Sequence, residues 1–174
     1  MPLASPDNLS SLWDFSLLHY ARAGVADACL RLQDEQGVNV NLLLWCAWLE
    51  RRGLVLNATR LRSAQLRIHS WDEHYVLPLR QLRRRMKAEF GVADADIERL
   101  RTQVKQVELL AERQVQLWLE AMVQTWDHTT IATPPAMGDN VRFYLQQFNL
   151  TEPAIMQLLD LLGGAPDSMA QERI

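Results

Sequence analysis

The chain has 174 residues, a formal net charge of −3, and 48% hydrophobic and 22% charged residues. This length suits one domain with a substantial core, and the composition is that of a globular protein, not of a disordered one. No apolar run approaches the length of a bilayer span, and no basic region followed by an apolar run opens the chain, so we expect neither a membrane protein nor a secretory signal.

The N-terminal part predicts two short helices. Residues 1–8 contain little that can pack, and we expect them to be flexible. Apolar residues at spacings of three and four then predict a helix over residues 9–21. Gly24 interrupts the pattern, and residues 25–36 resume it. The apolar face of the first helix carries Leu12, Phe15 and Leu18, with His19 beside them.

A third helix, over about residues 40–52, is predicted to lie at the centre of the fold. Its middle, residues 42–49, has eight apolar positions without a polar break. A helix that is apolar on every side has to be surrounded by other elements. Gly37 can end the preceding helix, Asn39 can cap this one, and Gly53 can end it.

Two long helices follow, over about residues 58–88 and 97–126. Pro78 lies inside the first and predicts a kink there, with a break near Ser70 as the alternative. The short connection between the two helices predicts an antiparallel pair. Their apolar stripes are Leu61, Ala64, Ile68, Trp71, Tyr75, Leu79, Leu82 and Met86, and Ile97, Leu100, Val104, Val107, Ala111, Val115, Trp118 and Met122.

Two short helices, over about residues 139–148 and 152–162, complete the pattern, and we expect residues 165–174 to be flexible. No stretch alternates as a half-buried strand would. The sequence therefore predicts an all-α fold: one domain over residues 1–174, built as a helical bundle around the third helix.

The cysteines and histidines give no sign of a metal centre. Cys29 and Cys46 fall on apolar helix faces without metal-ligand spacing, which fits buried, reduced thiols of a cytoplasmic protein. No histidine has a glutamate three residues before it, and no phosphate-binding glycine loop or nucleophile turn is present. We expect no metal and no organic cofactor, and no catalytic residue can be named.

Two polar groups lie next to predicted core positions, one at the turn before the third helix and one in the first long helix. If the two elements pass close together, a carboxylate, an imidazole and amides would converge in a small pocket. The alternative is helix capping together with ordinary solvated positions. The residues are Asp34, Asn39, Asn41, Asp72 and His74.

The first long helix is strongly basic, although the chain as a whole is acidic. Asp72 and Glu73 are its only acids. On a helical wheel Arg62, Arg80, Arg84 and Lys87 lie close together roughly opposite its apolar stripe, with Arg83 beside them. The candidate partner-binding residues on this basic face are Arg80, Arg83, Arg84 and Lys87. This face could bind an anionic partner. It could instead neutralise acids of neighbouring helices. Glu108 and Glu112 are such acids, and they are predicted to lie on a solvated face.

Two blocks of the sequence resemble a family of small proteobacterial proteins that is known only as a domain of unknown function. The first block comprises Leu12-Trp13-Asp14-Phe15-Ser16-Leu17, Gly24-Val25, Ala28-Cys29-Leu30, Leu32-Gln33-Asp34 and Val40-Asn41-Leu42-Leu43-Leu44-Trp45. The second comprises Pro78-Leu79-Arg80 and Leu82-Arg83-Arg84. The resemblance implies a bacterial cytoplasmic protein and assigns no reaction or ligand.

Three functions remain open from the sequence. The first is a non-enzymatic helical interaction module that binds a protein partner through the basic face or an apolar groove. The second is an association of the basic face with nucleic acid or the ribosome, which the acidic overall balance disfavours. The third is an enzyme or small-ligand-binding protein with its site near Asp34, Asn39, Asp72 and His74. The sequence leaves a homo-oligomer open.

Overall fold

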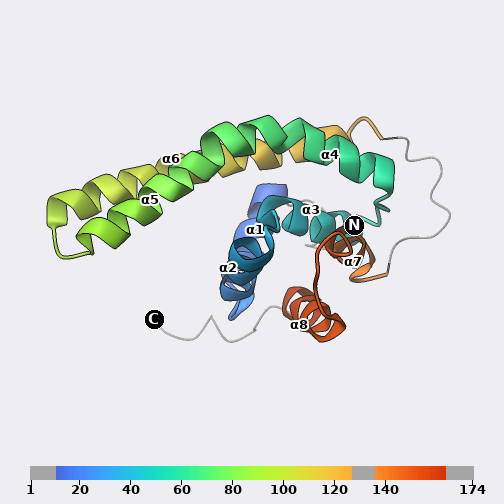
Figure 1. Ribbon diagram of the computed structural model, residues 1–174. Helices are drawn as coiled ribbons and strands as arrows, with labels where there is room; N and C mark the ends of the chain where they lie inside the picture. Colours follow the sequence, from blue (N-terminus) through green and yellow to red (C-terminus); the bar gives the residue numbers. More distant parts are fainter. Residues whose placement is uncertain (1–10, 127–135, 164–174) are drawn as a thin grey trace, which may run out of the picture. The chain divides into compact units, whose positions relative to one another are not determined.

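The structure is a computed structural model that describes residues 11–126 and 136–163. Every regular element in these residues is helical, so the predicted all-α bundle is confirmed (Figure 1). The predictions of flexible ends over residues 1–8 and 165–174 lie outside the described residues. The helices are α1 (Leu12–Tyr20), α2 (Val25–Gln36), α3 (Val40–Arg51), α4 (Ala58–Trp71), a π-helical segment (Asp72–Val76), α5 (Leu77–Phe90), α6 (Ala95–Val123), α7 (Asp139–Leu145) and α8 (Glu152–Gly163).

The chain forms two compact units, which we describe separately. The core unit comprises residues 1–61 and 126–174, and the hairpin unit comprises residues 62–125. The boundary falls inside α4, so this helix begins in one unit and ends in the other. The single domain over residues 1–174 stays a prediction. None of the helices in the described part of the chain has the length and apolar character needed to cross a membrane.

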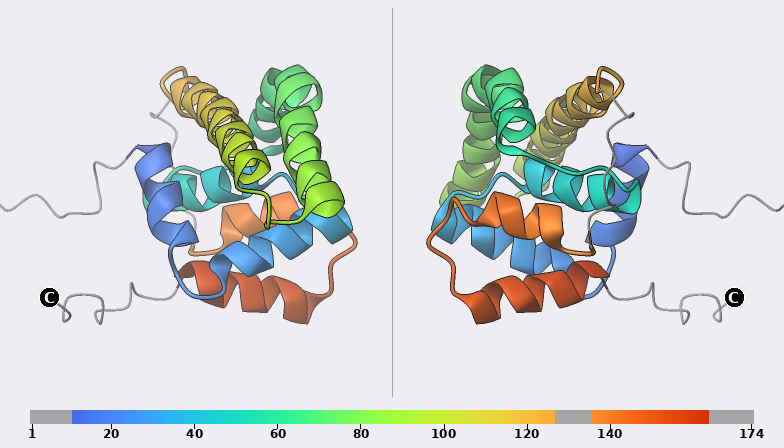
Figure 2. Two further views of the ribbon diagram at one scale, coloured as in Figure 1. Left: turned by 90° about the vertical axis from the view of Figure 1, so that its left-hand side faces the viewer. Right: turned by 90° about the vertical axis from the view of Figure 1, so that its right-hand side faces the viewer.

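Helix α3 is the centre of the core unit, as its sequence predicts. All its residues from Val40 to Leu49 are buried, and α1, α2 and α7 pack against it. Helix α8 lies along α2 and α7 (Figure 2). Both tryptophans of α3 are enclosed, and Trp45 meets Trp126 edge-on at a centroid distance of 5.7 Å.

The predicted helix ends around α3 are also found. Gly37 has φ +71°, the left-handed conformation that closes α2, and the Val38 amide donates to the Leu32 carbonyl. The Asn39 side chain accepts from the Leu42 amide at 3.1 Å and so caps α3. These local signals fix where the chain enters the central helix.

The hairpin unit differs from the prediction at Pro78. The helix is continuous through Ser70, so the alternative break there is wrong. Before Pro78 the helix widens into the π segment Asp72–Val76, and the Leu77 amide donates five residues back to the Asp72 carbonyl. Because proline lacks an amide hydrogen and its ring presses on the preceding turn, a widened turn accommodates it.

The π segment and the antiparallel packing of α5 on α6 change which side chains are buried. Val76 is buried, whereas Tyr75, predicted on the apolar stripe, is 53% exposed. One extra residue in the widened turn shifts the helix face by about one position. Leu82 on α5, and Leu100 and Val107 on α6, are exposed as well, so these parts of the predicted stripes are wrong.

Candidate functional site

Two of the four predicted basic-face residues, Arg80 and Arg83, form an ion-pair cluster inside the hairpin unit. Arg80 Nε lies 3.2 Å from Glu108 Oε1, and Arg80 Nη2 lies 2.6 Å from Glu112 Oε1. Arg83 donates to both carboxylate oxygens of Glu108, at 2.5 and 3.1 Å. The prediction that Glu108 and Glu112 lie on a solvated face is therefore wrong for Glu108, which is buried, and Glu112 is half-buried.

The electrostatics of this cluster follow from its enclosure. The hydrogen bonds to Glu108 raise the pKa of the Arg83 guanidinium. Burial raises the pKa of the Glu112 carboxyl, against the opposing effect of the nearby Arg80. Charged hydrogen bonds that are shielded from water hold α5 against α6 more firmly than exposed pairs would. Arg80 and Arg83 thus fix the hairpin.

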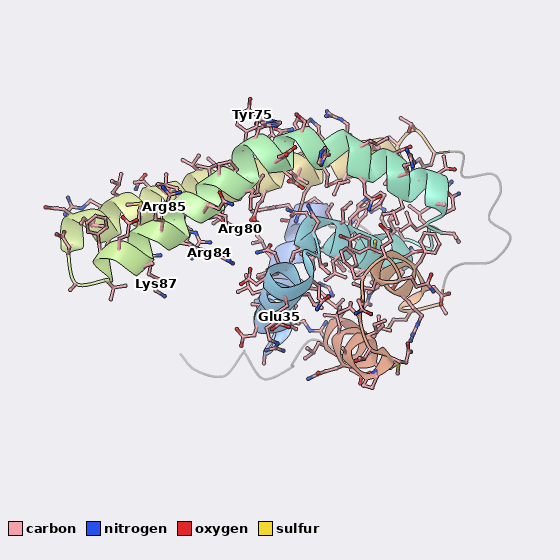
Figure 3. The ribbon with its side chains drawn as sticks, viewed as in Figure 1. Glu35, Tyr75, Arg80, Arg84, Arg85 and Lys87 are labelled. Atoms are coloured by element: carbon pink, nitrogen blue, oxygen red, sulfur yellow. The ribbon has the colours of Figure 1, made fainter. Side chains whose placement is uncertain are left out.

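The other two basic-face residues, Arg84 and Lys87, are exposed. Figure 3 shows them on the same side of α5 as Arg80, whereas Arg85 points away from that side. No side chain of α5 is fully buried, so Arg84 and Lys87 do not contribute to a hydrophobic core. Two of the four residues thus belong to the ion-pair cluster, and the other two, Arg84 and Lys87, are exposed; we call these two the basic pair.

The predicted polar pocket is divided between the units. Asp34, Asn39 and Asn41 belong to the core unit. Asp34 is exposed on α2, and Asn41 is buried in α3. The side chain of Asn39 caps α3, and its backbone amide donates to the hydroxyl of Tyr144 at 3.0 Å. Asn39 and Asn41 thus lie at the start of α3, where Asn39 also contacts α7 through Tyr144, and Asp34 lies on α2.

Asp72 and His74 belong to the π segment of the hairpin unit. His74 is exposed, and its Nδ1 lies 2.7 Å from the carbonyl oxygen of Ser70, one turn earlier. Asp72 is half-buried, and its carbonyl accepts the π-helical hydrogen bond from Leu77. The convergence of these two residues with the first three stays a prediction.

A small hollow in the core unit was not predicted. It measures about 290 Å³ including the solvent at its mouth, and His19 and Glu50 are the titratable groups on its wall besides Arg51. His19 stacks on Phe15 at a centroid distance of 3.8 Å, and its Nδ1 lies 2.9 Å from the Phe15 carbonyl oxygen. Burial lowers the pKa of this imidazole.

Glu50 is held by the start of α7. Its two carboxylate oxygens accept from the amides of Gly138 and Val141, at 2.7 and 2.9 Å. Burial raises the pKa of Glu50, and the two amides act against that rise. The carboxylate replaces a side-chain cap that Gly138 cannot supply. Nothing in the sequence near Glu50 could indicate a partner 88 residues further along the chain.

The described residues contain no group of three His, Cys, Asp or Glu side chains close enough together to hold a metal ion. Both cysteines are buried and free, and burial raises the pKa of Cys29 to about 11. They are therefore poor nucleophiles and poor metal ligands at neutral pH.

Comparison with known families decides what the chain belongs to. Residues 11–131 match the family model described as Protein of unknown function (DUF2390). The chain belongs to the DUF2390 family. The match includes α1 to α6 and with them the whole hairpin unit, which agrees with the resemblance seen in the sequence. No curated protein and no solved structure matches the chain.

Proposed function

We propose that this DUF2390 protein is a non-enzymatic helical interaction module that binds an acidic protein surface through the basic pair, Arg84 and Lys87. The observation that carries the proposal is the exposure of Arg84 and Lys87 on one side of α5. Arg80 and Arg83 are fixed to α6 by Glu108. Arg84 and Lys87 are exposed on a helix that is thereby held in place.

The chemistry favours a carboxylate-bearing partner. Arginine binds carboxylates through two parallel hydrogen bonds, and lysine adds a mobile point charge. The basic pair carries too little charge to hold a nucleic-acid backbone by itself, and the chain is acidic overall. We further propose that the protein works in the bacterial cytoplasm, on the grounds of the family resemblance and its buried reduced thiols.

The test compares charge reversals on two sides of α5 in the full chain, with Arg84→Glu alone as the single reversal that matches Arg85→Glu in charge. Binding of a fluorescent glutamate-rich peptide is followed by anisotropy at low and high salt. Arg84→Glu with Lys87→Glu should abolish binding, and Arg85→Glu, a reversal on the other side of the same helix, should leave most of it. Wild-type binding should weaken steeply with salt.

Two outcomes would overturn the proposal. One is equal binding by the wild type and the double variant. The other is tighter binding of a poly-uridine RNA of matched charge than of the acidic peptide, which would assign the face to nucleic acid. Circular dichroism on each variant checks that the helices remain intact.

A further inference from the structure

We infer that α6 forms an antiparallel pair with α6 of a second copy of this chain. Along α6 runs a stripe at steps of three and four residues, which we call the α6 stripe: Leu100, Gln103, Val107, Leu110, Gln114 and Leu117. Its four apolar members are between 49% and 63% exposed. Such a large set of exposed apolar side chains in one line indicates an interaction surface.

The α6 stripe is centred on a different side of the helix from the contacts with α4 and α5. Glu108 binds the arginines of α5, and the Ala111 carbonyl accepts from the Trp71 indole at 3.0 Å. Leu110 is two residues from Glu108 and therefore roughly 160° around the helix at about 100° per residue. The hairpin contacts thus leave this side of α6 uncovered.

The spacing and order of residues in the α6 stripe favour a second copy of α6 as its binding partner. The steps are three, four, three, four, three, the same in both directions along the chain. When a second α6 runs antiparallel, Leu100 faces Leu117, Gln103 faces Gln114, and Val107 faces Leu110, each twice by symmetry. Apolar side chains thus meet apolar ones and amides meet amides, over about 26 Å of helix.

The flanking charges match the same register. Arg99 precedes the first layer and is exposed, and Glu120 follows the last layer by less than one turn. In the antiparallel pair Arg99 of each copy lies beside Glu120 of the other, which gives two opposite-charge pairs at the rim. A parallel pair would place Arg99 beside Arg99 and Glu120 beside Glu120. Charge complementarity therefore favours the antiparallel arrangement.

Sedimentation velocity of the full chain over a range of concentrations tests the inference. The wild type should pass from one 20.0 kDa chain to two as its concentration rises. Leu110→Glu should weaken the dimer at least about tenfold, or 1.4 kcal/mol, because it places two carboxylates in the central layers. Leu109→Glu is the matched control, since Leu109 is its 41% exposed neighbour outside the stripe.

The register has its own test. Oxidation of Gln103→Cys mixed with Gln114→Cys should give a disulfide between the two variants, and each variant alone should give none, because its two thiols lie too far apart. The native Cys29 and Cys46 are both buried. Arg99→Glu should weaken the dimer, and Glu120→Arg added to it should restore most of the loss.

Three results would overturn the inference: a wild type that remains a single chain up to about millimolar concentration, equal dissociation of the Leu109→Glu and Leu110→Glu variants, or a disulfide formed by Gln103→Cys with itself. The basic pair is not altered in any of these variants. Failure of the dimer and failure of acidic-peptide binding are therefore separate results.

Discussion

His19 of α1 is buried in the core unit. Its ring is buried against Phe15, and burial lowers its pKa below the ordinary value of 6.5. An imidazole with a lowered folded pKa contributes stability above about pH 6.5, and that contribution is lost as the pH falls through the folded pKa. The hydrogen bond to Phe15 opposes the shift without reversing it.

We therefore predict that the wild type loses more unfolding free energy than His19→Leu between pH 7.5 and 5.5. Urea unfolding at several pH values measures the difference, in which the titration of all other groups cancels. His69→Leu makes the same substitution at an exposed histidine, which pairs with Glu73, and is the control for the loss of an imidazole as such. Parallel profiles for the wild type and His19→Leu would mean that folding does not lower the pKa of the His19 imidazole.

Glu108 is the residue on which the hairpin's ion pairs converge. Its side chain is only 6% exposed and accepts from both Arg80 and Arg83. We predict that Glu108→Gln destabilises the hairpin unit by about 3 kcal/mol, because two poorly solvated guanidinium groups lose their shared carboxylate. Hydrogen exchange at α5 and α6 measures the loss.

Glu98 supplies the matched control for that substitution. It pairs with Arg101 one turn away on the same helix, in a more exposed position. Glu98→Gln removes an ion pair of the same chemical type and should change hydrogen exchange little. If the two substitutions had equal effects, the enclosed cluster would be no more important to the hairpin than a surface pair.

At the scale of elements, the π segment Asp72–Val76 accommodates Pro78, which follows it in the helix. The π turn already relieves the contact between the proline ring and the preceding carbonyl, so Pro78→Ala should change the unfolding free energy by less than about 1 kcal/mol. A proline in the regular part of α5 has no such relief, and Gln81→Pro should cost about 3 kcal/mol or more. Thermal unfolding of both variants measures the contrast. A large loss in Pro78→Ala would show that the proline itself stabilises the widened turn.

The sequence predicts those parts of the fold that depend on neighbouring residues, and it fails where a widened turn or the packing of another helix decides. Around α3 the signals are local: Gly37 and Asn39 end and cap helices through atoms a few residues away, and the apolar run at 42–49 needs no partner to be recognised. The face that α5 presents depends instead on the π turn, whereas a helical wheel assumes a regular α-helix throughout. Tyr75 was therefore predicted buried in place of Val76. Helix α6 is regular, and which of its side chains are buried depends on how α5 packs on it.

The candidate site was predicted in part for a related reason. Charge spacing placed Arg80, Arg84 and Lys87 on one side of the helix, and Figure 3 shows them there. Spacing could not say which of these cations would meet Glu108 and Glu112, because that depends on how α5 packs on α6. The cap that Glu50 provides for α7 is equally non-local.

At the scale of the whole molecule, α4 joins the two units through a continuous helix, and the chain crosses between them a second time after Thr125. The boundary between Leu61 and Arg62 falls inside α4, where backbone hydrogen bonds connect each residue to the one four positions earlier. Unfolding of the part of α4 in one unit therefore removes hydrogen bonds from the part in the other unit. Helix formation is cooperative along a continuous ladder. We therefore predict that both units unfold in one transition, as one domain over residues 1–174 would.

A pair of core variants and one helix breaker test this coupling. Leu43→Ala in α3 should cost about 2–5 kcal/mol, since Leu43 is fully buried. The free energy of unfolding measured by hydrogen exchange should fall as much in α5 and α6 as it does in α3.

Ser63→Pro interrupts α4 at an exposed position just past the boundary, by removing an amide donor and crowding the carbonyl of Thr59. In this background the two units should unfold separately, and Leu43→Ala should then affect only the core unit. If the unaltered chain already unfolds in two steps, α4 does not couple the units and the single-domain prediction is wrong.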